Sequence, residues 1–304
     1  MGVLYLLESI RIPGLNEFML LVTQLGEETA FLVAALIVFW CVDKRKGYYL
    51  MTVGFIGTMA NQFLKLWFRI PRPWVLDPQF TILEQAREAA AGYSFPSGHS
   101  QSAVGTFGAI ANSTRNKWVK AISITVCVLV PLSRMYIGVH TPADVLVGAG
   151  MALAMVWLLK KPVVDKTSKA MKVLIPVMLV MAVGLLLFVK KYPFPADVDM
   201  HNLESGVKNA YTMLGCIAGV AVVYLLEKKY VNFETDAVWW AQLLKAVLGL
   251  AVVLAVKEGL RTPLDAMFAG HMVARGIRYF LIVLMVGFLW PMTFRWFGKL
   301  GVRK

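Results

Sequence analysis

The chain has 304 residues, of which 58% are hydrophobic and 16% are charged, whereas soluble domains have roughly 45–50% apolar and about 25% charged residues. Apolar runs near 20 residues long, enough to cross a bilayer, recur along it, so the composition excludes an ordinary soluble domain. The formal net charge of +13 does not indicate nucleic acid as a partner, because the cations fall mostly in short loops between apolar runs. Membrane orientation and anionic lipid headgroups account for them there.

In chain order, an entry segment precedes a series of apolar runs. Residues 1–25 alternate apolar and polar side chains, which predicts an amphipathic or re-entrant segment. Arg11, Pro13 and Gly14 interrupt its first apolar stretch, so we expect no cleavable signal peptide. The expected fold is all-α, a polytopic integral membrane helical bundle. Its roughly nine transmembrane helices are predicted near residues 26–42, 47–66, 99–112, 118–134, 141–160, 172–190, 209–227, 239–257 and 277–294.

Residues 74–95 form a long polar stretch between two of these spans. Within it, 81–91 has helical composition, and Gly92 follows as a stop signal. We therefore predict a helix that lies along the membrane interface. It would serve either as a simple connector or as a lid for a neighbouring site.

Lys65 and Arg72 are the first candidates for binding a ligand. They are seven residues apart, two helical turns, so we expect them to point the same way until Pro71 and Pro73 end the helix. Two cations at a helix end suit a phosphate group. The alternative is that both are interfacial residues whose long side chains reach toward water.

The tetrapeptide Pro96-Ser-Gly-His99 opens the next apolar run. Ser97 occupies the position of a helix N-cap, and Gly98 allows a ligand to approach the backbone. The free amides of the helix start and its dipole favour an anion there, beside which His99 would stand. The alternative is a capped helix start with an incidental histidine.

A third cluster consists of Arg134, His140 and Asp144. Thr141 is placed to cap the following helix, with Pro142 at its first position and Asp144 at its third. Asp144 is therefore either a capping carboxylate or the group that holds His140 in one tautomer. The two roles are compatible. Arg134 adds a planar fork of donors suited to phosphate oxygens.

The loops suggest an orientation for all three clusters. One set of loops holds more Lys and Arg than the other, and we expect this set in the cytoplasm; it comprises residues 44–46, 115–120, 160–172, 228–229 and 295–304. With nine spans, the three clusters then share the non-cytoplasmic face, as a common site requires.

On the residues of these three clusters, the chain resembles the type 2 phosphatidic acid phosphatase superfamily, which includes lipid phosphatases, glucose-6-phosphatase and the vanadium haloperoxidases. The resemblance covers residues 65–144. It rests on signature positions that are all filled: Lys65, Arg72, Pro73, Pro96, Ser97, Gly98, His99, Ser133, Arg134, His140 and Asp144.

The resemblance implies a role for each of these side chains. His140 would attack phosphorus to form a phosphohistidine, His99 would protonate the leaving alcohol, and Asp144 would orient His140. The phosphoryl oxygens would be held by Lys65, Arg72, Ser97, the Gly98 amide and Arg134. The resemblance implies no metal and no other cofactor. The three cysteines agree with this, because each lies inside an apolar run without metal-site spacing.

The C-terminal part carries a weaker resemblance. The stretch 278–291 and Phe297-Gly298 are similar to the end of sphingosine-1-phosphate phosphatases, although those commonly have Thr where Gly98 stands. A core family member needs about six helices. We therefore predict a six-helix phosphatase core with its entry segment over residues 1–171, followed by additional transmembrane helices over 172–304.

The expected function is hydrolysis of a lipid phosphate monoester, such as a long-chain-base phosphate or phosphatidate, through a phosphohistidine. A polyprenyl pyrophosphate or sugar-phosphate phosphatase is the alternative within the superfamily. A non-enzymatic lipid transporter or scramblase is the alternative from another class, but it does not explain two histidines and an orienting carboxylate. The expected location is an integral position in a prokaryotic cell membrane or the endoplasmic reticulum, with the phosphorylated lipid as partner and the site on the non-cytoplasmic face.

Overall fold

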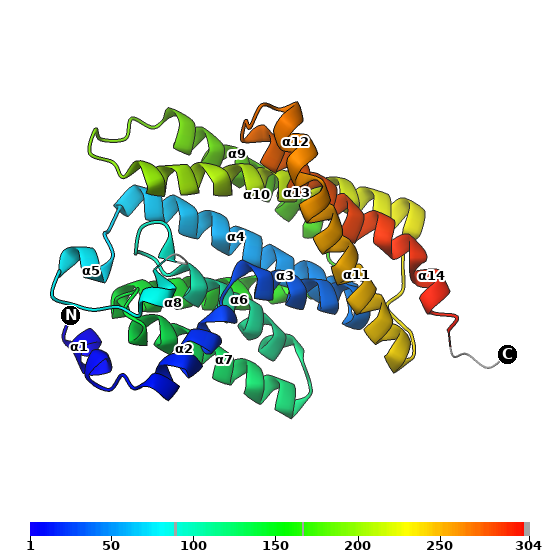
Figure 1. Cartoon of the computed structure of the whole chain (residues 1–304). Helices are drawn as coiled ribbons and strands as arrows, with labels where there is room; N and C mark the ends of the chain where they lie inside the picture. The colour runs from blue at the N-terminus through cyan, green and yellow to red at the C-terminus, as the bar shows by residue number, and fades with distance from the viewer. Residues whose placement is uncertain (88–89, 166, 301–304) are drawn as a thin grey trace. The chain divides into compact units, whose positions relative to one another are not determined.

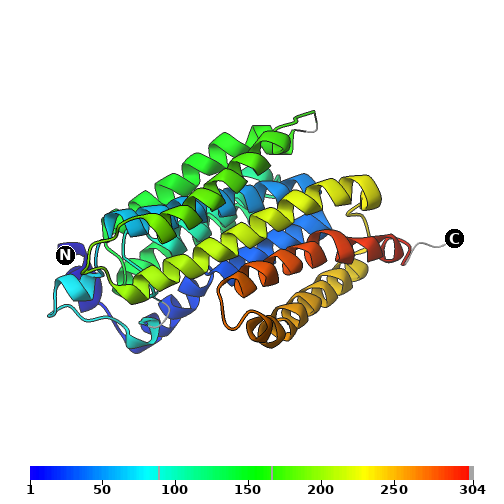
Figure 2. The ribbon, with the colours of Figure 1, turned by 90° about the horizontal axis from the view of Figure 1, so that it is seen from above.

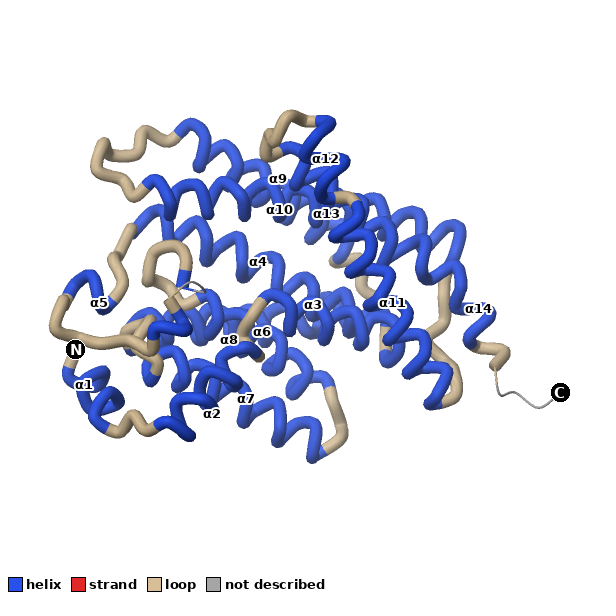
Figure 3. Tube along the Cα trace, viewed as in Figure 1, coloured by secondary structure: helices blue, strands red, loops and turns tan. Residues whose placement is uncertain are grey.

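The computed structural model describes residues 1–87, 90–165 and 167–300. Within these ranges the chain consists of helices joined by loops, without a β-strand (Figure 3). The predicted all-α class is thereby confirmed. The chain forms two compact units: unit 1 comprises Met1–Leu32, Tyr49–Asp165 and Pro193–Gly206, and unit 2 comprises Val33–Tyr48, Lys166–Tyr192 and Val207–Lys304.

Unit 1 contains the residues of all three clusters and most of the helices that position them. Its own helices are α1 (Gly2–Ser9), α2 (Pro13–Gln24), α5 (Pro73–Leu76), the 3₁₀ turn η2 (Glu84–Ala86), α6 (Gly98–Ser113), α7 (Lys117–Tyr136) and α8 (Pro142–Val164) (Figure 1). Three further helices have residues in both units: α3 (Glu28–Ile37), α4 (Lys44–Phe68) and α10 (Met200–Leu226).

Unit 2 holds the π-helical turn η1 (Val38–Val42) and the C-terminal helices. The C-terminal elements are α9 (Met171–Lys191), the π-helical turn η4 (Glu227–Val231), α11 (Trp239–Gly259), α12 (Arg261–Met267), α13 (Val273–Leu284), η5 (Met285–Leu289), η6 (Trp290–Thr293) and α14 (Phe294–Phe297). Figure 2 shows α13 alongside α10. The two are joined by a hydrogen bond, 2.7 Å long, that Arg275 Nε donates to Thr212 Oγ1.

Each of the nine predicted spans coincides with a helix, but fewer helices are long and apolar enough to cross a bilayer. Among the described residues six qualify, beginning at α7, α8, α9, α10, α11 and α13. A seventh is obtained if α2 and the helix over Glu28–Val42, bent by 53°, count as one broken or re-entrant span. The prediction for 47–66 fails this criterion because Asn61, Gln62 and Lys65 make α4 too polar. The prediction for 99–112 fails because α6 has only 16 residues.

The helix starts predicted from the sequence are confirmed. Ser97 caps α6 and accepts a hydrogen bond from the Ser100 amide. Thr141 caps α8 in a capping box, with Pro142 in the first turn and Asp144 at the third position. These caps satisfy amides that the first helical turn leaves unpaired, and they fix where each helix begins.

Two local predictions were wrong. Lys65 and Arg72 do not share a helix, because α4 ends at Phe68 and Arg69 adopts a left-handed conformation (φ 50°) that turns the chain. The interfacial helix predicted over 81–91 is not found in residues 81–87, where η2 is a single 3₁₀ turn; residues 88–89 lie outside the described ranges. Gly92, predicted to end that helix, has a left-handed conformation with φ 81°.

Candidate active site

His140 stands in the tight turn between α7 and α8. The turn is possible because Gly138 has φ 91°, a conformation that favours glycine. The Val139 amide then donates to Arg134 O at 3.1 Å, which closes the end of α7. His140 follows immediately and is only 1% exposed. The local backbone therefore holds its ring inside the protein.

Asp144 faces His140 from the first turn of α8. Its Oδ2 atom accepts hydrogen bonds from the Thr141 amide at 2.8 Å and from Ser94 Oγ at 2.6 Å. The same oxygen lies 3.4 Å from His140 Nδ1. The carboxylate thus serves as a helix cap and as a neighbour of the imidazole at once, because the cap geometry places it there.

Arg72 also contacts the His140 ring. Its Nη1 atom lies 2.9 Å from His140 Nε2 and 3.5 Å from Nδ1, and it donates to Val139 O at 2.9 Å. Its other nitrogens donate to Gly92 O and Ala91 O, each at 3.0 Å. A guanidinium has only donors, so Nε2 must accept. The ring hydrogen then sits on Nδ1, which faces Asp144.

Lys65 reaches the same loop from the last turn of α4. Its Nζ donates to Tyr93 O and, at 3.4 Å, to Ser94 O. Lys65 and Arg72 are 7% and 6% exposed. Although they leave the backbone from different elements, both cations are therefore buried against one short loop, 91–94.

The Pro96-Ser-Gly-His99 turn is held between α4 and α8. The Ser97 amide donates to Asp144 O at 2.9 Å, and Asn61 Nδ2 donates to Pro96 O at 3.4 Å. A Cβ atom on Gly148 of α8 would lie 2.5 Å from Ser97 O, so α8 can pack this closely only with glycine there. His99 extends from this turn, and its Nε2 atom is buried without a hydrogen-bond partner among the described residues.

Arg134 completes the set of buried cations and is 1% exposed. Its Nη1 donates to Thr23 Oγ1 of α2 at 2.8 Å, while its Nε has no partner among the described residues. The entry segment therefore contributes a residue that fixes Arg134. Buried donors without partners are costly, so this Nε and the His99 Nε2 suit an anionic group.

The electrostatics of the site keep His140 neutral. Burial lowers its pKa well below the ordinary value, and the positive charges of Arg72, Arg134 and Lys65 lower it further. Burial also lowers the pKa of Arg72, to about 10, against the opposing effect of Asp144. At neutral pH the site thus combines an uncharged imidazole with a charged guanidinium.

All eight predicted site residues lie in unit 1, and each touches or electrostatically influences another member of the set. The sequence did not single out three residues that support them: Thr23, Asn61 and Ser94. Ser94 lies within residues 65–144, but nothing in the sequence marks its hydroxyl as the partner of a carboxylate fifty residues away.

A cavity of about 850 Å³ opens beside Arg72. Its lining includes Trp74, Tyr93 and the cations Arg69 and Arg87, together with Asp197 and Asp199 before α10 and His201 in its first turn. His201 therefore lines a cavity next to the site. The mixed charges and the aromatic rings suit a headgroup that carries both signs of charge.

Among residues 1–87, 90–165 and 167–300, no group of three or more His, Cys, Asp and Glu side chains is arranged to hold a metal ion. The clustered groups are instead cations and imidazoles, which are donors toward an oxyanion.

Family models match two parts of the chain. Residues 45–168 match the model described as "PAP2 superfamily", and residues 211–302 match "PAP2 superfamily phosphatase, transmembrane extension". The first match contains all eight predicted site residues. The second lies within the C-terminal helices.

Several curated proteins are similar to about half of the chain. Phosphatidylglycerophosphatase B of Bacillus subtilis is 32% identical, over 50% of this chain and 76% of that protein. An undecaprenyl-diphosphatase of Sulfolobus acidocaldarius is 29% identical, over 45% and 66%. A probable sphingosine-1-phosphate phosphatase of Dictyostelium discoideum is 29% identical, over 48% of this chain and 38% of that protein.

One solved structure is also similar. It is the crystal structure of a transmembrane PAP2 type phosphatidylglycerolphosphate phosphatase from Bacillus subtilis, 30% identical to this chain. The match covers 52% of this chain and 81% of that one, with a TM-score of 0.44.

Proposed function

We propose that this chain, which belongs to the PAP2 superfamily and is an integral membrane protein, hydrolyses a lipid phosphate monoester through a phosphohistidine intermediate. The observation that carries the proposal is the orientation of His140. Its Nε2 accepts from Arg72 at 2.9 Å while Nδ1 faces Asp144 at 3.4 Å. A neutral imidazole oriented by a carboxylate is an activated nucleophile, and Arg72 adds a phosphate-binding cation beside its Nε2.

The proposed reaction has two displacements at phosphorus. In the first, the Nε2 lone pair of His140 forms a bond to phosphorus as the bond to the alcohol oxygen breaks, and His99 gives its proton to that oxygen. In the second, water attacks the phosphohistidine, His99 takes a proton from the water, and phosphate leaves with Nε2 restored. The ring becomes positively charged in the intermediate, where Asp144 stabilises it.

The cations supply most of the stabilisation that phosphoryl transfer requires. The transition state spreads negative charge over the equatorial oxygens, so positioned positive groups lower its free energy. Lys65, Arg72 and Arg134 are each less than 9% exposed, which strengthens their field. Ser97 and the Gly98 amide, at the start of α6, complete the proposed cradle.

Among lipid phosphates, we favour a long-chain-base phosphate. Such a substrate carries an ammonium group near its phosphate. The cavity beside Arg72 presents the exposed carboxylates of Asp197 and Asp199 as well as cations, which would suit both groups. Phosphatidate and polyprenyl diphosphates lack the ammonium. A polyprenyl diphosphate is the second candidate, because one relative is named an undecaprenyl-diphosphatase.

The test is a phosphate-release screen of the purified chain against long-chain-base phosphate, phosphatidate, phosphatidylglycerol phosphate and a polyprenyl diphosphate. Release should persist in EDTA, be inhibited by vanadate and be lost in His140→Ala, while His271→Ala, outside the proposed site, serves as the matched histidine control. Asp197→Asn should raise the KM for the long-chain-base phosphate and leave the KM for phosphatidate unchanged.

Two outcomes would contradict the proposal. Headgroup binding with no phosphate release from any substrate would favour a transporter or scramblase. Loss of phosphate release in EDTA, with recovery on adding a divalent ion, would overturn the mechanism.

The proposed site faces the non-cytoplasmic side of a prokaryotic cell membrane or of the endoplasmic reticulum. Support comes from the larger number of Lys and Arg in the opposite loops. The substrate would then be drawn from the outer or lumenal leaflet.

A further inference from the structure

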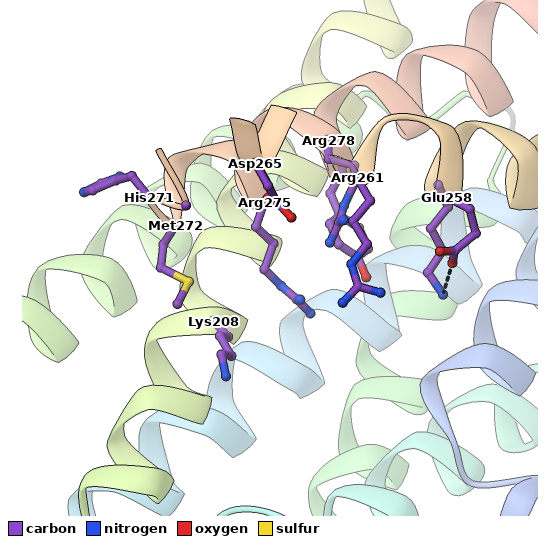
Figure 4. Close-up of a pocket in the computed structure, with 11 residues that line it drawn as sticks. Lys208, Glu258, Arg261, Asp265, His271, Met272, Arg275 and Arg278 are labelled. Carbon is purple, nitrogen blue, oxygen red and sulfur yellow. Dashed lines mark ion pairs between the residues drawn. The ribbon is translucent and has the colours of Figure 1, made fainter. Parts of the chain in front are cut away.

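Unit 2 contains a pocket that the proposed reaction does not use. It has a volume of about 460 Å³ and lies among the end of α11, α12, the start of α13 and Lys208 of α10 (Figure 4). We call it the extension pocket. Its lining residues are Lys208, Lys257, Glu258, Arg261, Asp265, Gly270, His271, Met272, Arg275, Arg278 and Tyr279.

The charges of the extension pocket are unbalanced. Its described lining has five cationic and two carboxylate side chains, a formal excess of three positive charges. One carboxylate, Glu258, lies 3.9 Å from Lys257, its sequence neighbour, and both side chains are largely exposed. Because this ion pair is exposed to water, it compensates little of the positive charge further inside the pocket.

Arg278 is the most informative lining residue. It is only 8% exposed, and its Nε has no hydrogen-bond partner among the described residues. Burying a guanidinium with an unused donor costs free energy unless an acceptor is supplied. The Tyr279 ring offsets part of this cost, since its centroid lies 5.8 Å from Arg278 Cζ and 5.4 Å from Arg275 Cζ.

The side chains are also arranged to act together. Figure 4 shows the guanidinium groups of Arg261 and Arg275 extending in the same direction, while His271 points away from them. Arg275 is held in place by its hydrogen bond to Thr212 on α10. Guanidinium forks fixed in this way match the oxygens of a phosphate group.

We propose that the extension pocket binds the phosphate group of an anionic species, either a lipid headgroup or free phosphate, at a site separate from the His140 site. The position favours a lipid, because the pocket lies where two apolar, span-length helices end and begin, and cations at such ends attract anionic headgroups. Phosphate chemistry is common to both sources, and the experiment separates them.

The experiment is native mass spectrometry of the full chain in detergent with phosphatidylglycerol, and with phosphatidylcholine as the zwitterionic reference. Phosphatidylglycerol is a diester, so its binding does not depend on the proposed hydrolysis. Arg275→Gln and Arg278→Gln should each weaken its binding about tenfold, as expected for the loss of a hydrogen bond made by a charged group. Arg261→Gln should also weaken it, and because Arg261 is exposed this variant keeps the test valid if a buried variant fails to fold.

The matched control is Arg295→Gln, an exposed arginine of α14 outside the pocket, which should bind like the wild type. A parallel titration with inorganic phosphate, read by thermal unfolding, identifies the source. If only the phosphate-dependent rise in Tm is lost in the pocket variants, the ligand is free phosphate. If the folded pocket variants retain wild-type phosphatidylglycerol binding and wild-type stabilisation by phosphate, the proposal is overturned.

Discussion

Arg72 Nη1 lies 2.9 Å from His140 Nε2, the atom that the proposed mechanism uses as the nucleophile. The contact sets the tautomer, because the arginine can only donate and the ring hydrogen must therefore face Asp144. It also places a positive charge beside the atom that attacks phosphorus, where it can hold an oxygen of the phosphoryl group. Arg72 thus both selects the tautomer of His140 and supplies a positive charge beside the phosphoryl group that His140 would attack.

Asp144→Asn separates catalysis from helix capping. The side-chain oxygen of Asn at position 144 can still accept from the amide of the N-cap Thr141, so the loss of stability should be about 1 kcal/mol or less, whereas kcat should fall by up to about 10⁴-fold, as for the analogous change in a serine protease triad. KM should change little, since the cations hold the phosphate. The control is Asp43→Asn, because Asp43 accepts from the Arg45 and Lys46 amides at the start of α4. Near-native turnover in Asp144→Asn would reduce that residue to a cap.

Ser94→Ala tests the residue that sequence reasoning missed. Its hydroxyl donates to the same Asp144 oxygen that faces His140, so its loss should lower kcat about tenfold, the effect of one hydrogen bond to a charged group. KM should stay constant, and Ser94→Thr should restore part of the rate. Ser113→Ala, which removes a hydroxyl bonded to Ala109 O in α6, is the control. A change in stability without a change in kcat would assign Ser94 a purely structural role.

His99→Ala tests the general acid. An alkoxide needs a proton as it leaves, but nitrophenolate needs it far less. The variant should therefore lose much more activity on an alkyl phosphate than on an aryl phosphate. Arg134→Gln is the comparison, because a binding residue should reduce both rates alike. Equal losses in His99→Ala would indicate that His99 only binds phosphate.

The protonation of His140 can be measured without substrate. Since burial and three neighbouring cations lower its pKa, the ring should stay neutral as the pH falls to 6.5 and take up its proton only below that value. ¹⁵N NMR of histidine-labelled protein, assigned with His140→Ala, should show a neutral ring protonated on Nδ1 at pH 7. An imidazolium signal at pH 7 would contradict both the pKa direction and the tautomer.

The orientation in the membrane can be tested with introduced cysteines. In a background without Cys41, Cys127 and Cys216, cysteines at Gln79 and His201, both exposed, should react with impermeant thiol reagents from the non-cytoplasmic side. A cysteine at Lys46 should not. Lys166, the second expected cytoplasmic position, lies outside the described residues. The reverse labelling pattern would place the site in the cytoplasm.

Local sequence patterns determined the class of fold and most of the helix starts. Apolar periodicity and length specify a membrane helix without reference to the rest of the chain. The caps at Ser97 and Thr141 were equally predictable, because a cap is satisfied by amides within four residues of it. The family signature likewise selected the candidate histidines, cations and carboxylate from short-range spacing alone.

Only the tertiary structure decided how those residues meet. The assumption that Lys65 and Arg72 share a helix failed, because Arg69 turns the chain and the two cations converge through the loop at 91–94. The partnership of Ser94 with Asp144, and of Thr23 with Arg134, joins residues 50 and 111 positions apart. Contacts over such separations depend on how helices pack, which periodicity and capping signals do not encode. The sequence therefore determined the parts of the site, and packing determined its geometry.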